Sequence, residues 1–150
     1  IERRRRHPDY RFAVLFLDFD RFKLINDSLG HEVGDLLLIE ISSRLMSSLR
    51  ATDMISHSTM PIRVGGDEFM IICPNTKPQN ALSFAQELLA QVNTLHVAAG
   101  GGFWEGSVSV GVATNTDNMA TLTDLIKAAD EALYAAKAAG KNCVRQHISA

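Results

Sequence analysis

The sequence has few cysteines, no excess of charge of either sign, and no long apolar run. Its 150 residues include only two cysteines, Cys73 and Cys143, which lie far apart and indicate reduced thiols rather than a disulfide scaffold. No apolar stretch reaches the roughly 18 residues of a membrane span, and no signal peptide is visible. These absences favour one cytoplasmic domain over residues 1–150 without direct membrane insertion, whether or not a parent protein is anchored in a membrane.

The net charge of −2 gives no general attraction to nucleic acid, so no nucleic-acid partner is expected. A run of four arginines, Arg3 to Arg6, is the exception. It could contact phosphates or lipid, but a solvated cluster near the chain end is the simpler interpretation. The chain opens without Met inside a charged segment typical of a helix, so we expect it to be a fragment of a longer protein.

Apolar patterns predict several strands. The nearly continuous apolar run before the acids at 11–20 is typical of a central strand covered on both faces. Residues 107–114 alternate, as in a strand with one half-buried face. IRV and FMIIC flank GGDE, which predicts two strands joined by a tight turn. The remaining candidates are a closing strand in NCVRQHI, a loop or hairpin tip in AAGGGF, and a part-strand, part-loop segment in TDMISHSTMP.

Other patterns predict helices. Leu38, Ile41, Leu45 and Leu49 are spaced by three and four, which predicts an amphipathic helix over 31–50. Further helices are expected over 21–30 with a stop at Gly30, over 79–96, and from a capping-box-like sequence at Thr121 to Gly140. The order is roughly βααββαβαβ with at least one hairpin. It predicts an α+β fold, a three-layer α/β sandwich with a central mixed, largely antiparallel sheet of about five strands.

Acidic residues stand at the ends of two predicted strands. Asp18 ends the first, and Asp67 and Glu68 begin another. If these strands are neighbours, three carboxylates converge, and crowded carboxylates hold either protons or a cation such as Mg²⁺ or Mn²⁺, which would suit nucleotide chemistry. The alternative is that all three point into water. Strand alternation also lets only one of Asp67 and Glu68 face Asp18, unless the turn distorts the backbone.

Polar residues on the helical segments form a second set. Asn26 and Asp35 together offer the hydrogen-bonding groups that a guanine edge requires. Taken alone, they are explained more simply by a helix cap and by an acid in a first helical turn. Lys137 and Lys141 lie one helical turn apart and could hold a triphosphate, although lysines are common at a helix C-terminus.

Two blocks give the sequence a family likeness. LDFDRFKLINDSLGHEVGDLLL at 17–38, followed by RVGGDEF at 63–69, resembles the GGDEF family, the diguanylate cyclases. SVSVGVA and ADEALYAAKAAGKN resemble the family's later strand and last helix, so the resemblance covers nearly the whole chain. It implies a GGDEF domain over residues 1–150 with a nucleotide-cyclase, palm-like fold. It also implies a homodimer that joins two GTP into cyclic di-GMP, with pyrophosphate leaving and Mg²⁺ (or Mn²⁺) as cofactor.

The resemblance also implies residue roles. Asp18, the carbonyl of Phe19, and Asp67 would bind the metal, and Asp67 would also be the base for the 3′-hydroxyl. Glu68 belongs to the same acidic site. By the same resemblance, three groups of residues would contact the substrate. They are the glycines Gly65 and Gly66 beside the nucleotide, the guanine readers Asn26 and Asp35, and the phosphate-binding residues Phe22, Lys23, Lys137 and Lys141.

The chain departs from the family in two places. It lacks the D-x-L-T-G-L-x-N-R segment with which members usually begin, so we expect an N-terminally truncated fragment with impaired activity. Arg50 and Asp53 match the R-x-x-D pattern of product inhibition, but the spacer from Met54 to Val64 is longer than usual. Inhibition through these two residues therefore stays open, and Arg50 could simply end its helix.

Two residues and the choice of function remain. We expect His31 to cap and pack its turn rather than to take part in chemistry, and Trp104 to be a hairpin-tip side chain rather than a partner contact. The competing function is a non-catalytic GGDEF module that binds GTP or cyclic di-GMP and regulates an attached EAL phosphodiesterase domain, since DRFKLINDSLGH resembles the version often followed by such a domain. A sensory domain is a further expected neighbour in the parent chain. A pure dimerisation domain would not explain the acids.

Overall fold

The computed structural model describes residues 11–51, 59–65, 67–99, 102–115 and 121–147. Several sequence expectations lie outside these residues: the arginines Arg3 to Arg6, Asp53, Gly66, and most of the TDMISHSTMP segment. Among the described helices, none combines the length and the apolar character needed to cross a bilayer. Both cysteines are free thiols as predicted, and burial raises the pKa of Cys73 to about 12.

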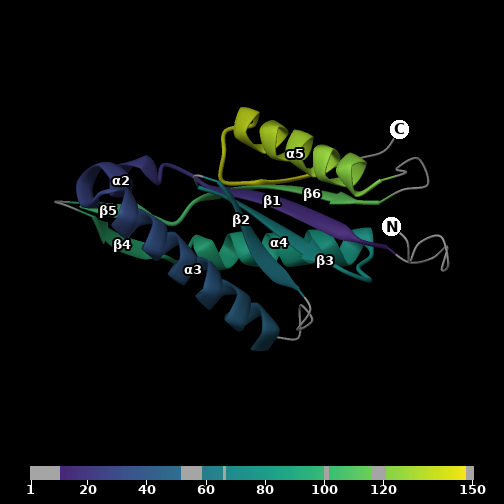
Figure 1. Ribbon diagram of the computed structural model, residues 1–150, viewed down its shortest axis with the longest axis horizontal. Helices are drawn as coiled ribbons and strands as arrows, with labels where there is room; N and C mark the ends of the chain where they lie inside the picture. The colour runs from purple at the N-terminus through teal and green to yellow at the C-terminus, as the bar shows by residue number, and fades with distance from the viewer. Residues whose placement is uncertain (1–10, 52–58, 66, 100–101, 116–120, 148–150) are drawn as a thin grey trace.

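A five-stranded sheet in the order β2-β3-β1-β6-β7 forms the middle layer (Figure 1). β1 pairs antiparallel with both β3 and β6, β2 pairs antiparallel with β3, and β7 runs parallel to β6. The strands are β1 (Ala13–Phe19), β2 (Met60–Gly65), β3 (Glu68–Cys73), β6 (Val108–Thr114) and β7 (Val144–Gln146). The predicted central position of β1 and the mixed, largely antiparallel sheet are confirmed.

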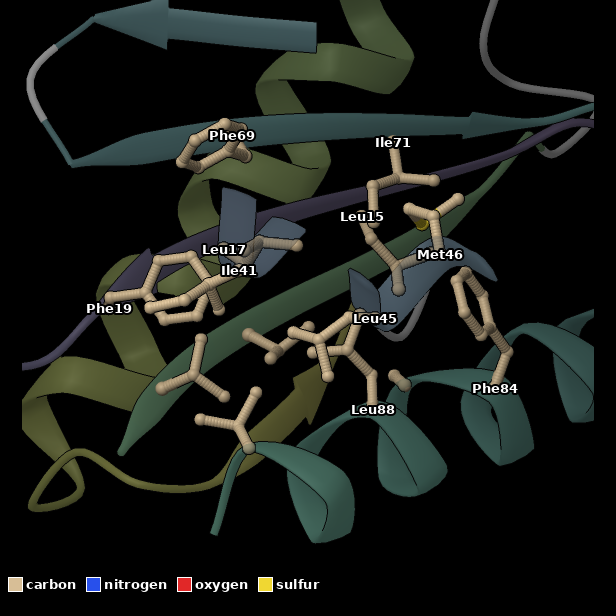
Figure 2. Packing of buried hydrophobic residues seen from close by; sticks show 14 of the residues in the cluster. Leu15, Leu17, Phe19, Ile41, Leu45, Met46, Phe69, Ile71, Phe84 and Leu88 are labelled. Atoms are coloured by element: carbon tan, nitrogen blue, oxygen red, sulfur yellow. The ribbon is translucent and has the colours of Figure 1, made fainter. Parts of the chain in front are cut away.

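Helices cover both faces of the sheet. α5 (Leu122–Ala138) lies over one face, and α3 (His31–Ala51) and α4 (Pro78–Val92) lie over the other (Figure 1). Because side chains alternate along a strand, β1 feeds two cores: Val14 packs with α5, while Leu15 packs with α3 and α4. Figure 2 shows the second core, where Leu15 lies near Leu45 and Leu88. The predicted three-layer sandwich is confirmed.

Local signals set the helix ends that frame the site. α2 (Lys23–Leu29) stops at Gly30, which has a φ of 87° and donates its N–H to the Asn26 carbonyl at 2.9 Å. Glycine suits this left-handed position because it has no Cβ. At α5, the Thr121 side chain accepts a hydrogen bond from the Asp124 N–H at 3.2 Å, as the capping-box pattern predicts.

The helix predicted over 79–96 is too long. α4 ends at Val92, and the Thr94 hydroxyl then donates to the Gln91 carbonyl at 2.7 Å, which turns the chain out of the helix. The residues that follow form β4 (His96–Ala99) and β5 (Gly102–Glu105), a separate two-stranded sheet. The pairing of β4 with β5 on either side of residues 100–101 agrees with the hairpin-tip alternative for AAGGGF, although the expected element order lacked these two strands.

The exposure predicted for one face of β6 is also wrong, because all seven of its residues are buried. Its small residues Ser109, Gly111 and Ala113 look like a solvent face in the sequence, but α5 packs directly on Gly111 and Ala113. A Cβ added at Gly111 would lie 2.1 Å from the Leu133 nitrogen and 2.4 Å from the Ala129 carbonyl oxygen. The missing side chain therefore lets α5 approach the sheet closely.

Replacing Gly111 tests this close contact. Because both atoms facing its missing Cβ belong to the backbone of α5, Gly111→Ala forces the whole helix away from β6. We expect the free energy of unfolding, measured by urea denaturation, to fall by about 1–3 kcal/mol. Ala135→Ser adds one heavy atom to the exposed face of α5 and should change stability by no more than about 0.5 kcal/mol. Equal effects of the two substitutions would contradict this account of the packing.

Candidate functional site

Acids from β1 and β3 meet at one end of the sheet. Asp18 lies directly opposite Glu68 in the antiparallel register of the two strands. Glu68 shares its face with Met70 and Ile72, which pack under α5, so both carboxylates emerge on the α5 side. Asp67 lies in the turn just before β3. The expected adjacency of the two strands is confirmed, and the regular ladder brings Glu68, rather than Asp67, beside Asp18.

Lys137 reaches the same place from the last turn of α5. Its Nζ lies 2.6 Å from Oδ2 of Asp18. Figure 1 shows the C-terminal end of α5 above the end of the sheet where β1 finishes and β3 begins. In the described parts of the chain, no three His, Cys, Asp or Glu side chains are grouped closely enough to hold a metal ion. The expected convergence of three carboxylates is therefore incomplete, because Lys137 pairs with Asp18 while Asp67 stays in the turn.

Burial and neighbouring charges shift the pKa values of the ionisable groups at this end of the sheet. Burial raises the pKa of Asp67, and the negative charge of Asp18 raises it further, although Arg63 lowers it. Burial also raises the pKa of Glu68, with Lys137 lowering it and Asp18 raising it. Burial alone would lower the pKa of Lys137, but its hydrogen bond to Asp18 and the nearby acids raise it above the usual value.

These shifts bear on whether a cation fits the site. A carboxyl group with a raised pKa holds its proton more tightly in the folded chain than in the unfolded chain, so its ionisation opposes folding as pH rises above the ordinary value. A divalent cation would relieve the repulsion between the ionised carboxylates. Carboxylate and carbonyl oxygens are the ligands that Mg²⁺ and Mn²⁺ prefer. Asp18, Asp67, Glu68 and the Phe19 carbonyl offer oxygen atoms of that kind, but within the described residues the side chains are not grouped as a ready-made metal site. The Phe19 ring packs edge-on against Phe69 and Trp104, which anchors the backbone there.

The expected guanine readers lie on neighbouring helices. The Oδ1 atom of Asn26 on α2 is buried without a hydrogen-bond partner. It packs so tightly against Gly34 of α3 that a Cβ there would lie 1.9 Å away, which places Asn26 next to the residue that precedes Asp35. Asp35 accepts a hydrogen bond from Nη2 of Arg63 at 2.6 Å. A buried amide oxygen without a donor is uncommon and costs free energy unless a ligand supplies one.

The expected phosphate contacts lie around the same end. Phe22, at the start of α2, is buried against Trp104, and Lys23 is exposed. Lys141 is also exposed, in a left-handed turn after α5. At Gly65, an added Cβ would meet nothing within 4 Å, so the backbone is open to close approach as expected.

Arg50 and His31 have clear surroundings. The guanidinium of Arg50 donates through Nη2 to the Thr59 carbonyl, just before β2, and its Nε is buried without a partner. This contact ties the end of α3 to the residue just before β2. His31 opens α3, where its charge acts on Asp67 and lowers the pKa of that acid.

Sequence reasoning missed the contacts of three residues in this region: Trp104, Arg63 and Asp20. Trp104 is buried rather than exposed at a hairpin tip, and its Nε1 donates to the Asp20 carbonyl at 2.7 Å. Arg63 pairs with Asp35, and Asp20 accepts several hydrogen bonds. A signal for Trp104 was present, because tryptophan side chains are highly buried on average. No local pattern indicated the partners of Arg63 or Asp20.

The pKa values can be measured by NMR titration of ¹³C-labelled carboxyl groups in the metal-free chain. We expect those of Asp67 and Glu68 to lie above their ordinary values of 3.8 and 4.5. Asp18→Asn removes a negative charge and should lower both pKa values. Lys137→Met removes a positive charge beside Glu68 and should raise the pKa of Glu68. Asp27→Asn, at an exposed position of α2, is the matched control and should leave both unchanged; unchanged values in Asp18→Asn would contradict the proposed coupling.

Comparisons with known proteins agree on one family. The profile described as "Diguanylate cyclase, GGDEF domain" matches residues 1–143. The bifunctional diguanylate cyclase/cyclic di-GMP phosphodiesterase MucR of Pseudomonas aeruginosa is 38% identical over 134 residues, which are 89% of this chain and 18% of MucR. Two other curated relatives are covered over only 12% and 28% of their length.

Solved structures give the same result. The GGDEF domain of TpbB from Pseudomonas aeruginosa superposes with a TM-score of 0.81 at 30% identity, over 99% of this chain and 89% of that one. The GGDEF domain of DgcB from Caulobacter crescentus, solved in complex with c-di-GMP, superposes with a TM-score of 0.77 at 25% identity, over 93% and 77% of the two chains. The predicted fold class is confirmed by these superpositions.

Proposed function

This chain belongs to the GGDEF family of diguanylate cyclase domains, and on that basis we propose that it condenses two GTP molecules into cyclic di-GMP. The observation that carries the proposal is the position of Asp18 directly opposite Glu68, with the Lys137 ammonium 2.6 Å from Asp18. Transfer of a phosphoryl-type group depends mainly on positioning and on neutralising charge. An end of a sheet that combines acids for a cation with a protonated lysine suits that chemistry.

The proposed reaction is a substitution at phosphorus. The 3′-hydroxyl oxygen of one GTP attacks the α-phosphorus of the other, and the bond to the bridging oxygen of the departing pyrophosphate breaks. The Asp67 carboxylate accepts the hydroxyl proton, and its raised pKa makes it a stronger base than an ordinary aspartate. A second, equivalent reaction closes the ring, so each cyclic di-GMP releases two pyrophosphates.

The other charged residues have supporting roles in this proposal. Asp18, the Phe19 carbonyl and Asp67 would hold Mg²⁺ or Mn²⁺, and Glu68 is a further candidate ligand because it faces Asp18. When bound, the ion supplies positive charge that offsets the charge developing on the phosphate oxygens. Lys137 is protonated at neutral pH, its hydrogen bond to Asp18 helps to raise its pKa further, and with Lys141 it adds positive charge on the α5 side.

The guanine base would lie between α2 and α3. The unpaired Oδ1 of Asn26 lacks a donor, and the N1–H and N2–H₂ groups of guanine are donors. Arg63 holds the Asp35 carboxylate through Oδ1, which limits the conformations of that side chain before a base arrives. These two acceptors would favour guanine over adenine, since adenine presents no N1–H.

We also propose that two copies act together. The product contains two phosphodiester bonds, whereas the described residues supply the Asp18–Glu68 pair once per chain. Two domains facing each other would place the 3′-hydroxyl of each GTP near the α-phosphorus of the other.

A regulatory GGDEF module is the second candidate function. One relative, MucR, is named as both a cyclase and a phosphodiesterase, and the chain covers 18% of it, so a parent protein with an EAL-type or a sensory domain fits this comparison. Such a module would bind GTP or cyclic di-GMP without converting it. Product binding at Arg50 and Asp53 belongs to this proposal, and it would require Arg50 to exchange its bond to the Thr59 carbonyl for the ligand.

The deciding experiment incubates the purified chain with GTP and Mg²⁺ and separates the products by chromatography. We expect cyclic di-GMP from the wild type and a rate at least about 100-fold lower from Asp67→Asn, because the amide cannot accept the proton. Asp27→Asn, an exposed change of the same kind, should leave the rate unaltered. GTP binding that needs Mg²⁺ but yields no product would favour the regulatory module, and a chain that neither binds nor converts GTP would contradict the proposal.

The guanine contact can be tested through Gly34. A Cβ at this position collides with the far end of the Asn26 side chain, which can swing aside, so Gly34→Ala should fold with nearly wild-type stability. Displacing the amide should weaken GTP binding about tenfold, as measured by calorimetry. Binding of inorganic tripolyphosphate should stay the same. Asn26→Ala should give a similar loss, and the double variant little more, because both changes remove one contact. Wild-type GTP affinity in Gly34→Ala would remove Asn26 from the guanine site.

A further inference from the structure

Asp20 is a buried carboxylate just beyond β1, with 4% of its surface exposed. Its Oδ2 accepts hydrogen bonds from the Ser107 hydroxyl at 2.6 Å and from the Asn142 N–H at 3.0 Å. Its Oδ1 accepts from the Ser109 hydroxyl at 2.7 Å. Every one of these donors comes from a segment far from Asp20 in the sequence.

The backbone of Asp20 is held as firmly as its side chain. Its N–H donates to the Ser107 carbonyl at 2.8 Å, and its carbonyl accepts from Nε1 of Trp104 at 2.7 Å. The next residue, Arg21, has a φ of 58°, a left-handed conformation that residues other than glycine rarely adopt. Such a conformation persists only where the surroundings fix it, and the bonds to Asp20 do so immediately before Phe22 and Lys23.

A second strained segment lies on the other side of Asp20. Gly140, Lys141 and Asn142 have φ values of 114°, 65° and 47°, so the chain leaves α5 through three successive left-handed residues. The Lys141 N–H donates to the Ala136 carbonyl at 3.1 Å, and the Asn142 N–H donates to Asp20. The carboxylate of Asp20 therefore closes the turn that carries Lys141.

We propose that Asp20 is a positioning residue that joins the two sides of the triphosphate site, the start of α2 and the Lys141 turn. It does not touch the substrate in this role. Its two oxygens connect β6 and the Lys141 turn to the end of β1, two residues after Asp18. Lys141 and the first turn of α2, which carries Lys23, therefore keep fixed places around the phosphates. This inference rests on the proposed function, and it deepens it by assigning a carboxylate outside the metal and guanine contacts.

The chemistry of the donors makes the acceptor character of Asp20 essential. The Asn142 N–H can only donate, so the group facing it must be an acceptor. In Asp20→Asn the amide oxygen can take that place, because the Ser109 hydroxyl can rotate and accept from the amide nitrogen. Asp20→Ala offers no acceptor at all. Partial rescue by asparagine is therefore a specific consequence of the proposed role.

The experiment combines two measurements on the wild type, Asp20→Ala, Asp20→Asn and the exposed control Asp27→Ala. NMR hydrogen exchange reports the bond of the Asn142 amide, and calorimetry reports the affinities for inorganic tripolyphosphate and for guanosine, each with Mg²⁺. In Asp20→Ala we expect the Asn142 amide to exchange at least about tenfold faster and tripolyphosphate to bind at least about tenfold more weakly. Guanosine affinity should stay within about twofold, since neither Asn26 nor Asp35 takes part in these bonds. Asp20→Asn should lie between Asp20→Ala and the wild type, and Asp27→Ala should match the wild type.

Two results would overturn the inference. One is wild-type exchange and wild-type tripolyphosphate affinity in Asp20→Ala. The other is an equal loss of tripolyphosphate and guanosine binding, which would mean a general loss of structure. If Asp20→Ala does not fold, Asp20→Asn decides by the same measurements, and wild-type values for both exchange and tripolyphosphate affinity would overturn the inference. If the wild type binds neither GTP nor tripolyphosphate, the proposed function fails, and the exchange of Asn142 alone then decides whether Asp20 holds the turn.

Discussion

The antiparallel pairing of β1 between β3 and β6 is the constraint on which both the core and the site depend. Because neighbouring side chains of a strand point to opposite faces, Leu17 and Phe19 enter the core beneath α3 and α4, while Asp18 emerges on the α5 side. The same register sets Asp18 opposite Glu68 on one flank and opposite Ser109 on the other. A slip of one residue would bury the acid and expose its apolar neighbours, so the packing of the core fixes the acids of the site.

The face of the sheet that α5 covers supplies the positive charge. α5 lies close to β6 because Gly111 has no side chain, and this closeness brings Lys137 to Asp18. Burial, and to a lesser extent the charge of Asp18, raises the pKa of Asp67 and Glu68, so their ionisation opposes folding, and such a cost is common at sites that bind charged ligands. A divalent cation and a triphosphate would complete the balance of charge that Lys137 begins.

The β4–β5 hairpin stands outside the main sheet, yet its Trp104 side chain supports the site. Trp104 packs edge-on against Phe19 and Phe22, and its indole N–H binds the Asp20 carbonyl. The ring contacts fill the space under the start of α2, and the hydrogen bond satisfies the one polar atom of a buried tryptophan. The hairpin therefore holds the turn that links the acids of β1 to the helix that carries Asn26.

The sequence by itself determined the features that depend on neighbouring residues: the buried run of β1, the amphipathic spacing of α3, the stop at Gly30 and the cap at Thr121. It also indicated, through its motifs, which polar residues to examine. Only the tertiary structure decided their partners. Arg63 and Asp35 are 28 residues apart, and Trp104 and Asp20 are 84 apart, so no local period links them. Whether the small-residue face of β6 meets water or a helix was likewise settled by α5, since burial depends on what packs against a strand and its own alternation shows only that two faces exist.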